Sequence, residues 1–104
     1  MDDEKAAAAR CGEARRRPRV IARVVAPGHC PYYKEGQEFR LGGFTPKGVC
    51  DSAYAALSRD AQTMRCGGTL PWQKDGRVLT RCPDPDGALW ELRMEAPPDE
   101  VGLA

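Results

Sequence analysis

The sequence lacks several features that would assign it to a broad class. No apolar run approaches the roughly 18 residues that a membrane-spanning helix needs, so we expect no membrane association. Sixteen Lys and Arg against 15 Asp and Glu give a net charge of +1, without the basic surplus of a typical nucleic-acid-binding surface. No Cys-x-x-Cys pair occurs, so the most specific sequence signal for zinc is missing. These absences disfavour membrane, nucleic-acid and zinc-finger proteins.

Cysteine, in contrast, is abundant. The chain has 5 cysteines among 104 residues, and an odd number disfavours a fully paired secreted framework. Residues 1–17 carry acids where a signal peptide has positive charge, and they lack a leucine-rich stretch, so we expect a cytoplasmic protein. In a reducing compartment the thiols have four interpretations: buried packing residues, metal ligands, a nucleophile or a redox centre.

The pattern of apolar residues predicts one α+β domain over residues 18–95, between flexible tails at 1–17 and 96–104. We expect an antiparallel sheet that ends in a C-terminal hairpin and packs against one main helix. The expected elements are a strand at 19–27, a short strand at 38–41, a helix beginning directly after Asp51 or Ser52 and ending before Gly67, and hairpin strands at 77–82 and 88–94.

Several side chains have an expected place in this fold. The residues Ala53, Ala56, Leu57, Ala61 and Met64 recur at helical spacing and predict the stripe that faces the sheet. Trp72, in the loop after the helix, is expected to fill the edge of the core. The hairpin loop PDPDG contains Asp84 and Asp86, which we interpret as turn residues rather than as an acid/base pair.

Helix length separates two of the cysteines. Cys50 precedes the predicted helix and Cys66 lies near its end, which places them roughly 24 Å apart at 1.5 Å per residue. We therefore interpret Cys66 as a packing residue at the helix exit, and Cys11 as incidental within the tail. Cys30 and Cys82 each lie where a strand ends, as Cys50 lies where the helix begins. These three ends can converge at one edge of a small sheet.

The three cysteines are the candidate metal ligands, with His29 as a fourth. Each of Cys30 and Cys82 is followed by proline, a step found in some iron–sulfur ligand runs, so zinc or an iron–sulfur cluster is the candidate cofactor. Cys50 and His29 are also the candidate catalytic pair, because a helix N-terminus favours a thiolate and histidine can serve as a general base. The opposing interpretation is that the thiols only pack in the core.

Four motifs, CPYYKEGQEF, TPKGVC, CGGTLPW and RCPDPDG, occur in this order between about residues 20 and 94. Together they resemble a family of short bacterial and archaeal proteins to which no activity is assigned. The resemblance implies one compact domain and singles out Cys30, Cys50 and Cys82. The chain departs from the family where a histidine usually follows the first Cys-Pro, so His29 would have to supply a fourth ligand from the other side.

Two functions follow as hypotheses. The first is a site of three cysteines that binds a metal ion or iron–sulfur cluster, or that performs thiol chemistry. The second is a non-catalytic interaction module or accessory subunit with structural cysteines. A small sheet has open edges, so a second copy of the chain or another protein is a candidate partner.

Overall fold

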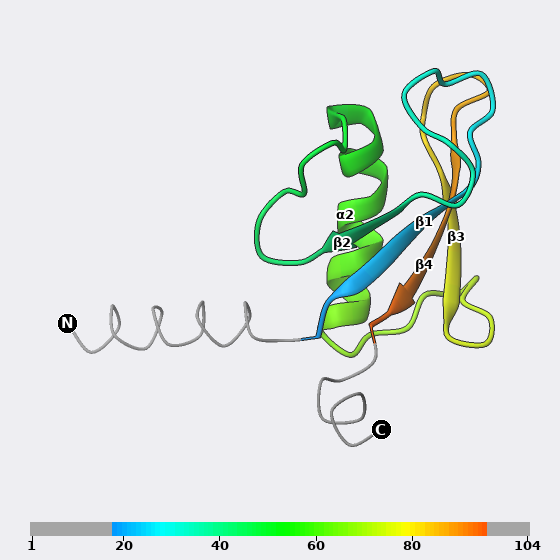
Figure 1. Cartoon of the computed structure of the whole chain (residues 1–104). Coiled ribbons are helices and arrows are strands. Elements are labelled where there is room, and N and C mark those ends of the chain that lie inside the picture. Colours follow the sequence, from blue (N-terminus) through cyan, green and yellow to red (C-terminus); the bar gives the residue numbers. More distant parts are fainter. Residues whose placement is uncertain (1–17, 96–104) are drawn as a thin grey trace.

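A computed structural model describes residues 18–95, which form a four-stranded antiparallel sheet with one helix across a single face (Figure 1). The α+β prediction is therefore confirmed, including the C-terminal hairpin that packs on the helix. The two predicted tails lie outside the described residues. The elements are β1 (Val20–Ala26), β2 (Glu38–Leu41), α2 (Asp51–Arg65), β3 (Arg77–Arg81) and β4 (Leu89–Met94).

The sheet has the order β2-β1-β4-β3. Its two central strands, β1 and β4, are therefore the first and the last strand along the described residues. All three pairings are antiparallel, and Val24 pairs with Trp90 in the central one. The pairing of β1 with β4 shifts register between Val24 and Ala26. The outer strands β2 and β3 are the open edges.

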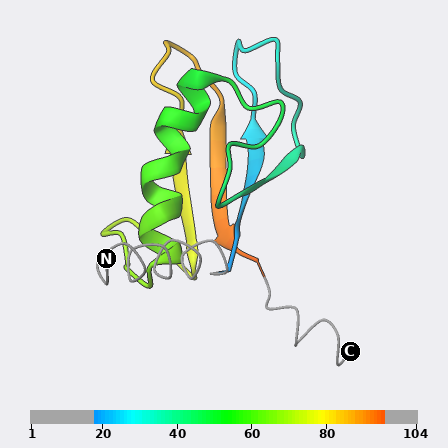
Figure 2. The same cartoon turned by 90° about the vertical axis from the view of Figure 1, so that its left-hand side faces the viewer.

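Helix α2 lies over one face of the sheet and supplies the other half of the core (Figure 2). Four residues of its predicted stripe are buried and Ala56 is half-buried, because residues at this spacing share the one helix face that meets the sheet. The strands contribute alternate residues, since successive side chains in a strand point to opposite faces. The buried side chains that these elements share are Val20, Ala22, Val24, Leu41, Ala53, Leu57, Ala61, Met64, Val78, Trp90 and Leu92.

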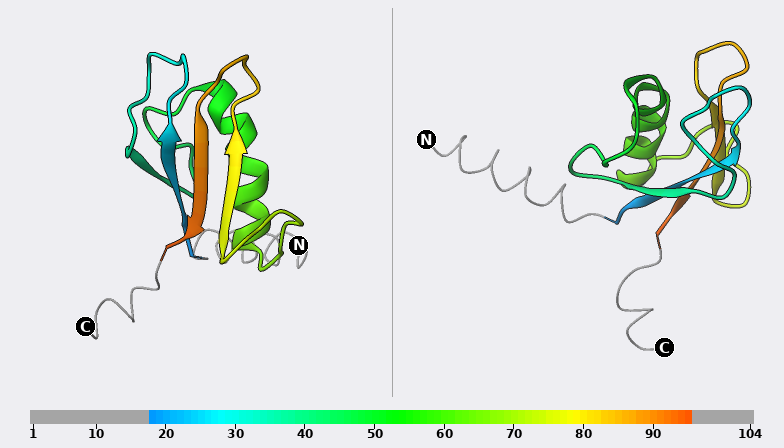
Figure 3. Two further views of the ribbon diagram at one scale, coloured as in Figure 1. Left: turned by 90° about the vertical axis from the view of Figure 1, so that its right-hand side faces the viewer. Right: turned by 45° about the horizontal axis from the view of Figure 1, so that its top comes forward.

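The opposite face of the sheet carries no helix within residues 18–95 (Figure 3, left). Leu79 on β3 is 53% exposed, and Trp72 is 55% exposed beside it in the lining of a shallow surface pocket. The prediction that Trp72 fills the edge of the core is therefore wrong. Trp90 of β4 already occupies the core, and the loop between α2 and β3 carries Trp72 to the outside of the edge strand.

The ends of α2 differ in part from the prediction. Cys50 itself is the N-cap residue, with extended backbone and no side-chain capping hydrogen bond, so the assignment of the cap to Asp51 or Ser52 is wrong. At the other end, Gly67 takes a left-handed φ of 86°, and its N–H donates to the carbonyl of Met64. This is the glycine stop expected after a helix.

None of the helices in the described part of the chain is long and apolar enough to cross a bilayer.

The fold gathers three connections at one end of the sheet. The loop after β1, the β3–β4 hairpin loop and the start of α2 all lie at the top of the molecule in Figure 1. Each of the three carries one cysteine of the candidate site.

Candidate functional site

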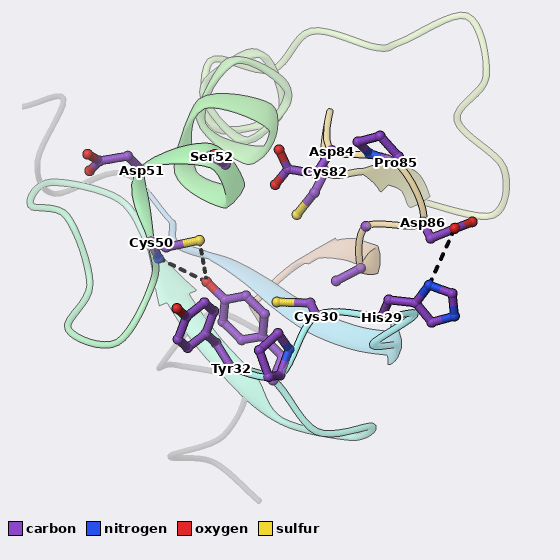
Figure 4. Close-up of a pocket in the computed structure, with 14 residues that line it drawn as sticks. His29, Cys30, Tyr32, Cys50, Asp51, Ser52, Cys82, Asp84, Pro85 and Asp86 are labelled. Atoms are coloured by element: carbon purple, nitrogen blue, oxygen red, sulfur yellow. Dashed lines mark hydrogen bonds and ion pairs between the residues drawn. The ribbon is translucent and has the colours of Figure 1, made fainter.

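A pocket of about 500 Å³ opens where the three connections meet, and Cys30, Cys50 and Cys82 all line it. The close-up in Figure 4 shows the three sulfurs pointing into the space between the helix start and the two loops. The structure thus brings together the three cysteines that the sequence singled out. The other lining residues are His29, Pro31, Tyr32, Tyr33, Asp51, Ser52, Asp84, Pro85, Asp86, Gly87 and Ala88.

A backbone hydrogen bond and a close backbone contact hold the two loops of the pocket together. The N–H of His29 donates to the carbonyl of Asp86 at 2.9 Å, which ties the loop after β1 to the hairpin loop. Gly28 approaches the same carbonyl so closely that a Cβ at this position would lie 2.3 Å from the oxygen. Glycine, with a φ of 61° here, permits both the left-handed backbone and the contact. The positions of Cys30 and Cys82 are fixed relative to each other by this junction.

Tyr33 ties the same loop to the helix. Its hydroxyl accepts a hydrogen bond from the backbone N–H of Cys50 at 2.9 Å and donates one to the Sγ of Cys50 at 3.1 Å. The ring is held from below by Trp90 and Phe39, with edge-to-face centroid distances of 4.9 and 6.0 Å. Burial and the hydrogen bond to Cys50 raise the pKa of Tyr33 to about 12. Tyr33 therefore stays protonated and remains a donor to the sulfur at neutral pH.

Cys50 is the exposed thiol of the pocket. Its sulfur lies at the N-terminus of a helix of 15 residues, where backbone N–H groups without intrahelical partners favour negative charge. The Tyr33 hydroxyl adds a donor from the opposite side. An accessible sulfur, a helix N-terminus and a hydrogen-bond donor thus coincide at Cys50.

Cys82 is placed differently. Its side chain is 7% exposed, and its sulfur accepts a hydrogen bond from the indole N–H of Trp90 at 3.3 Å. Burial raises the pKa of Cys82, and the hydrogen bond from Trp90 offsets part of this rise, while the neighbouring Cys50 and Cys30 add smaller contributions that raise it. Cys82 is therefore a protonated thiol at neutral pH. The exposure of Cys30 is intermediate between that of the exposed Cys50 and that of the buried Cys82.

His29 does not adjoin Cys50. Its Nδ1 lies 3.4 Å from a carboxylate oxygen of Asp86 at the rim, with both side chains mostly exposed. Figure 4 places the ring on the far side of Cys30 and turned toward Asp86. The candidate pair of Cys50 and His29 is thus not assembled in this structure, and His29 is a residue of the pocket rim.

The remaining cysteines lie elsewhere. Cys66 follows the last residue of α2, so an unbroken helix separates it from Cys50 as predicted. It is exposed, however, and the interpretation of Cys66 as a packing residue at the helix exit is wrong. It lies among polar residues of the helix surface, with Gln62 donating to its sulfur at 3.9 Å. Cys11 falls outside the described residues.

No group of three or more His, Cys, Asp or Glu side chains within residues 18–95 is arranged so that it could hold a metal ion. In this conformation the Tyr33 hydroxyl donates a hydrogen bond to the sulfur of Cys50. Zinc or iron–sulfur binding by Cys30, Cys50 and Cys82 therefore stays a prediction that requires the pocket to rearrange.

Two contributors to the site have no signal in the sequence. Tyr33 and Tyr32 are adjacent in an irregular loop, and nothing local indicates that Tyr33 is buried while Tyr32 is 78% exposed. The indole of Trp90 lies in the core, and its hydrogen bond to Cys82 depends on the hairpin register. Both follow only from tertiary packing.

Comparisons with family models, curated proteins and solved structures give no match to this chain. The resemblance of its four motifs to a family of short bacterial and archaeal proteins thus stays a prediction. Function has to be argued from the pocket itself.

Proposed function

We propose that the pocket performs thiol chemistry, with Cys50 as the nucleophile and Cys30 as a second, resolving thiol. The observation that carries the proposal is the exposed sulfur of Cys50, which shares one pocket with two further thiols and accepts a hydrogen bond from Tyr33. A thiolate is the reactive form of cysteine, and helix N-termini and hydrogen-bond donors are surroundings in which reactive cysteines of proteins are found.

The reaction that suits neighbouring thiols is thiol–disulfide exchange with a small disulfide. The Cys50 thiolate attacks one sulfur of the substrate, the substrate S–S bond breaks, and the departing thiolate takes a proton from water. A mixed disulfide then links Cys50 to half of the substrate. Attack by the Cys30 thiolate on the Cys50 sulfur releases that half as a second thiol. The substrate is reduced by two electrons, and the protein is oxidised to a Cys30–Cys50 disulfide.

Cys82 has a supporting role in this proposal. Its burial raises its pKa and favours the neutral thiol, although the hydrogen bond from Trp90 acts in the opposite direction, so it is the poorer resolving group. Cys30 is more accessible, and its sulfur points toward the centre of the pocket (Figure 4). A reducing cytoplasm would return the protein to its dithiol form.

The test compares the alkylation rates of individual cysteines in the native protein by peptide mass spectrometry with iodoacetamide. We expect Cys50 to react faster than Cys66, a matched exposed cysteine at the other end of the same helix. Oxidation with 2-hydroxyethyl disulfide should give a Cys30–Cys50 disulfide, and Cys30→Ser should stop at the mixed disulfide.

Equal rates at Cys50 and Cys66, with no Cys30–Cys50 product, would overturn the proposal and favour an interaction module with structural cysteines. The metal alternative has its own measurement, because all three sulfurs point into one space. Zinc or iron retained after anaerobic purification, and lost in the triple Cys→Ser variant, would favour the metal site over exchange.

A further inference from the structure

The charges around the pocket are of one sign. Asp51, Asp84 and Asp86 line it, whereas no Lys or Arg among the described residues does. Arg81 reaches the hairpin loop, but its guanidinium donates to the carbonyl of Gly87 at 3.2 Å and the residue lines a different pocket. The overall charge of the chain is close to zero, so this local excess of acid is a property of the pocket.

The three carboxylates are not equivalent. Figure 4 shows the carboxylate of Asp84 beside Cys82, directed into the space between the hairpin loop and the helix start. The carboxylate of Asp86 turns outward to His29, and that of Asp51 points away from the pocket. Asp84 is therefore the charge that a ligand at Cys50 would meet within the pocket.

An aromatic ring completes the wall. Tyr32 lines the pocket and is 78% exposed, so its face is available to a ligand. A positively charged group near an aromatic face is attracted by the ring quadrupole. An anionic ligand would gain nothing from the ring and would be repelled by Asp84.

We infer that the pocket selects cationic disulfides over anionic ones, with Asp84 as the residue that sets this preference. The inference rests on the proposed exchange reaction and names its substrate class: a small disulfide that carries amino groups near the sulfurs. Exchange follows the steps given above, and the disulfide itself is the oxidant. Coulomb attraction at this range is screened by salt, so the preference should be strongest at low ionic strength.

The experiment uses three small symmetrical disulfides of matched size: cystamine, which is cationic, 2-hydroxyethyl disulfide, which is neutral, and 3,3′-dithiodipropionate, which is anionic. The rate of adduct formation at Cys50 is measured by mass spectrometry on the full chain at low salt. Each rate is divided by the rate of the same disulfide with N-acetylcysteine amide, an uncharged reference thiol. We expect a normalised ratio of cystamine to dithiodipropionate of roughly tenfold.

Two variants identify the source of the ratio. Asp84→Asn should lower it at least twofold, and 1 M NaCl should bring it close to that of the reference thiol. Asp75→Asn makes the same charge change in the loop before β3, at the opposite end of the sheet, and should leave the ratio unchanged. Folding of each variant is checked by its unfolding midpoint.

The possible outcomes distinguish a failure of the proposed function from a failure of the inferred substrate class. If Cys50 reacts with the neutral disulfide no faster than Cys66, the proposed function fails. If Cys50 is the fastest thiol but shows no charge preference, exchange stands and the substrate class is wrong. A preference that survives both Asp84→Asn and high salt would overturn the assignment to Asp84.

Discussion

The hydroxyl of Tyr33 lies between the backbone and the sulfur of Cys50, accepting from the N–H at 2.9 Å and donating to Sγ at 3.1 Å. This relationship joins the loop after β1 to the start of α2. It also fixes the sulfur relative to the helix N-terminus. One side chain thus sets both the geometry of the pocket and the electrostatic surroundings of its exposed thiol.

Tyr33→Phe tests this relationship. The variant keeps the ring between Phe39 and Trp90 but removes both hydrogen bonds to Cys50. We expect the free energy of unfolding to fall by about 1 kcal/mol and the alkylation rate of Cys50 at neutral pH to fall roughly threefold to tenfold. Urea unfolding and peptide mass spectrometry measure the two effects.

Tyr32→Phe is the matched control, because that side chain is 78% exposed and its ring is retained. It should change neither quantity. A Tyr33→Phe variant whose Cys50 reacts at the wild-type rate would show that the hydroxyl does not activate the thiol.

Cys82 allows the structural role of a thiol to be separated from its chemistry. Cys82→Ala leaves the buried indole N–H of Trp90 without its acceptor, which costs about 1–3 kcal/mol. Cys82→Ser restores an oxygen acceptor at nearly the same position, so its loss of stability should be smaller. Chemical denaturation of the two variants under reducing conditions checks the order, and an alanine variant as stable as the serine one would contradict it.

Much of the fold could be predicted from the sequence because its signals are local. Alternating burial in Val20, Ala22 and Val24 needs only the two-residue period of a strand, and the β3–β4 hairpin is specified by its PDPDG turn. The convergence of three cysteines also followed from their places at element ends. Such arguments use chain position alone.

Other features could not be predicted because they depend on how elements pack. Burial of Tyr33 rather than Tyr32 is decided by the ring of Trp90, which comes from the other end of the chain. Trp72 is exposed because the loop after α2 passes outside β3 instead of under the helix. Topology thus decides which aromatic residues are buried. Hydrophobicity alone predicted the wrong location for Trp72.

Stability should fall as the pH rises into the alkaline range. The pKa of Cys82 is raised above its ordinary value of 9.0, and that of Tyr33 rises from 10.0 to about 12. Both groups bind protons more tightly in the folded state, so their contribution is complete below the unfolded pKa values and is lost as pH rises through the folded ones.

Thermal melts between pH 7 and 11 measure this loss. We expect the decrease in Tm to begin near pH 9, the ordinary pKa of the Cys82 thiol. Cys82→Ser should flatten the curve just above this pH, and Tyr33→Phe should flatten it above about pH 10. Because other tyrosines and lysines titrate in the same range, the quantity compared is the difference from the wild-type curve. If the curves of Tm against pH run parallel for variant and wild type, the loss of stability at alkaline pH does not come from Cys82 and Tyr33.

Gly28 provides a test of the junction that holds the two cysteine loops together. Gly28→Ala places a Cβ 2.3 Å from the carbonyl oxygen of Asp86, on a backbone with a φ of 61°. Gly76→Ala is the matched control, since Gly76 has a φ of 75° but no atom within 4 Å of its added Cβ. The control should lose about 1–2 kcal/mol from the left-handed conformation alone.

Gly28→Ala should lose clearly more than the control, because the hairpin loop has to move away from the loop after β1. That movement opens the cover over Cys82, whose side chain is 7% exposed in the native fold. We therefore expect alkylation of Cys82 to accelerate in Gly28→Ala and to stay slow in Gly76→Ala. Equal destabilisation of the two variants, with Cys82 equally protected in both, would mean that the contact between Gly28 and Asp86 does not hold the pocket closed.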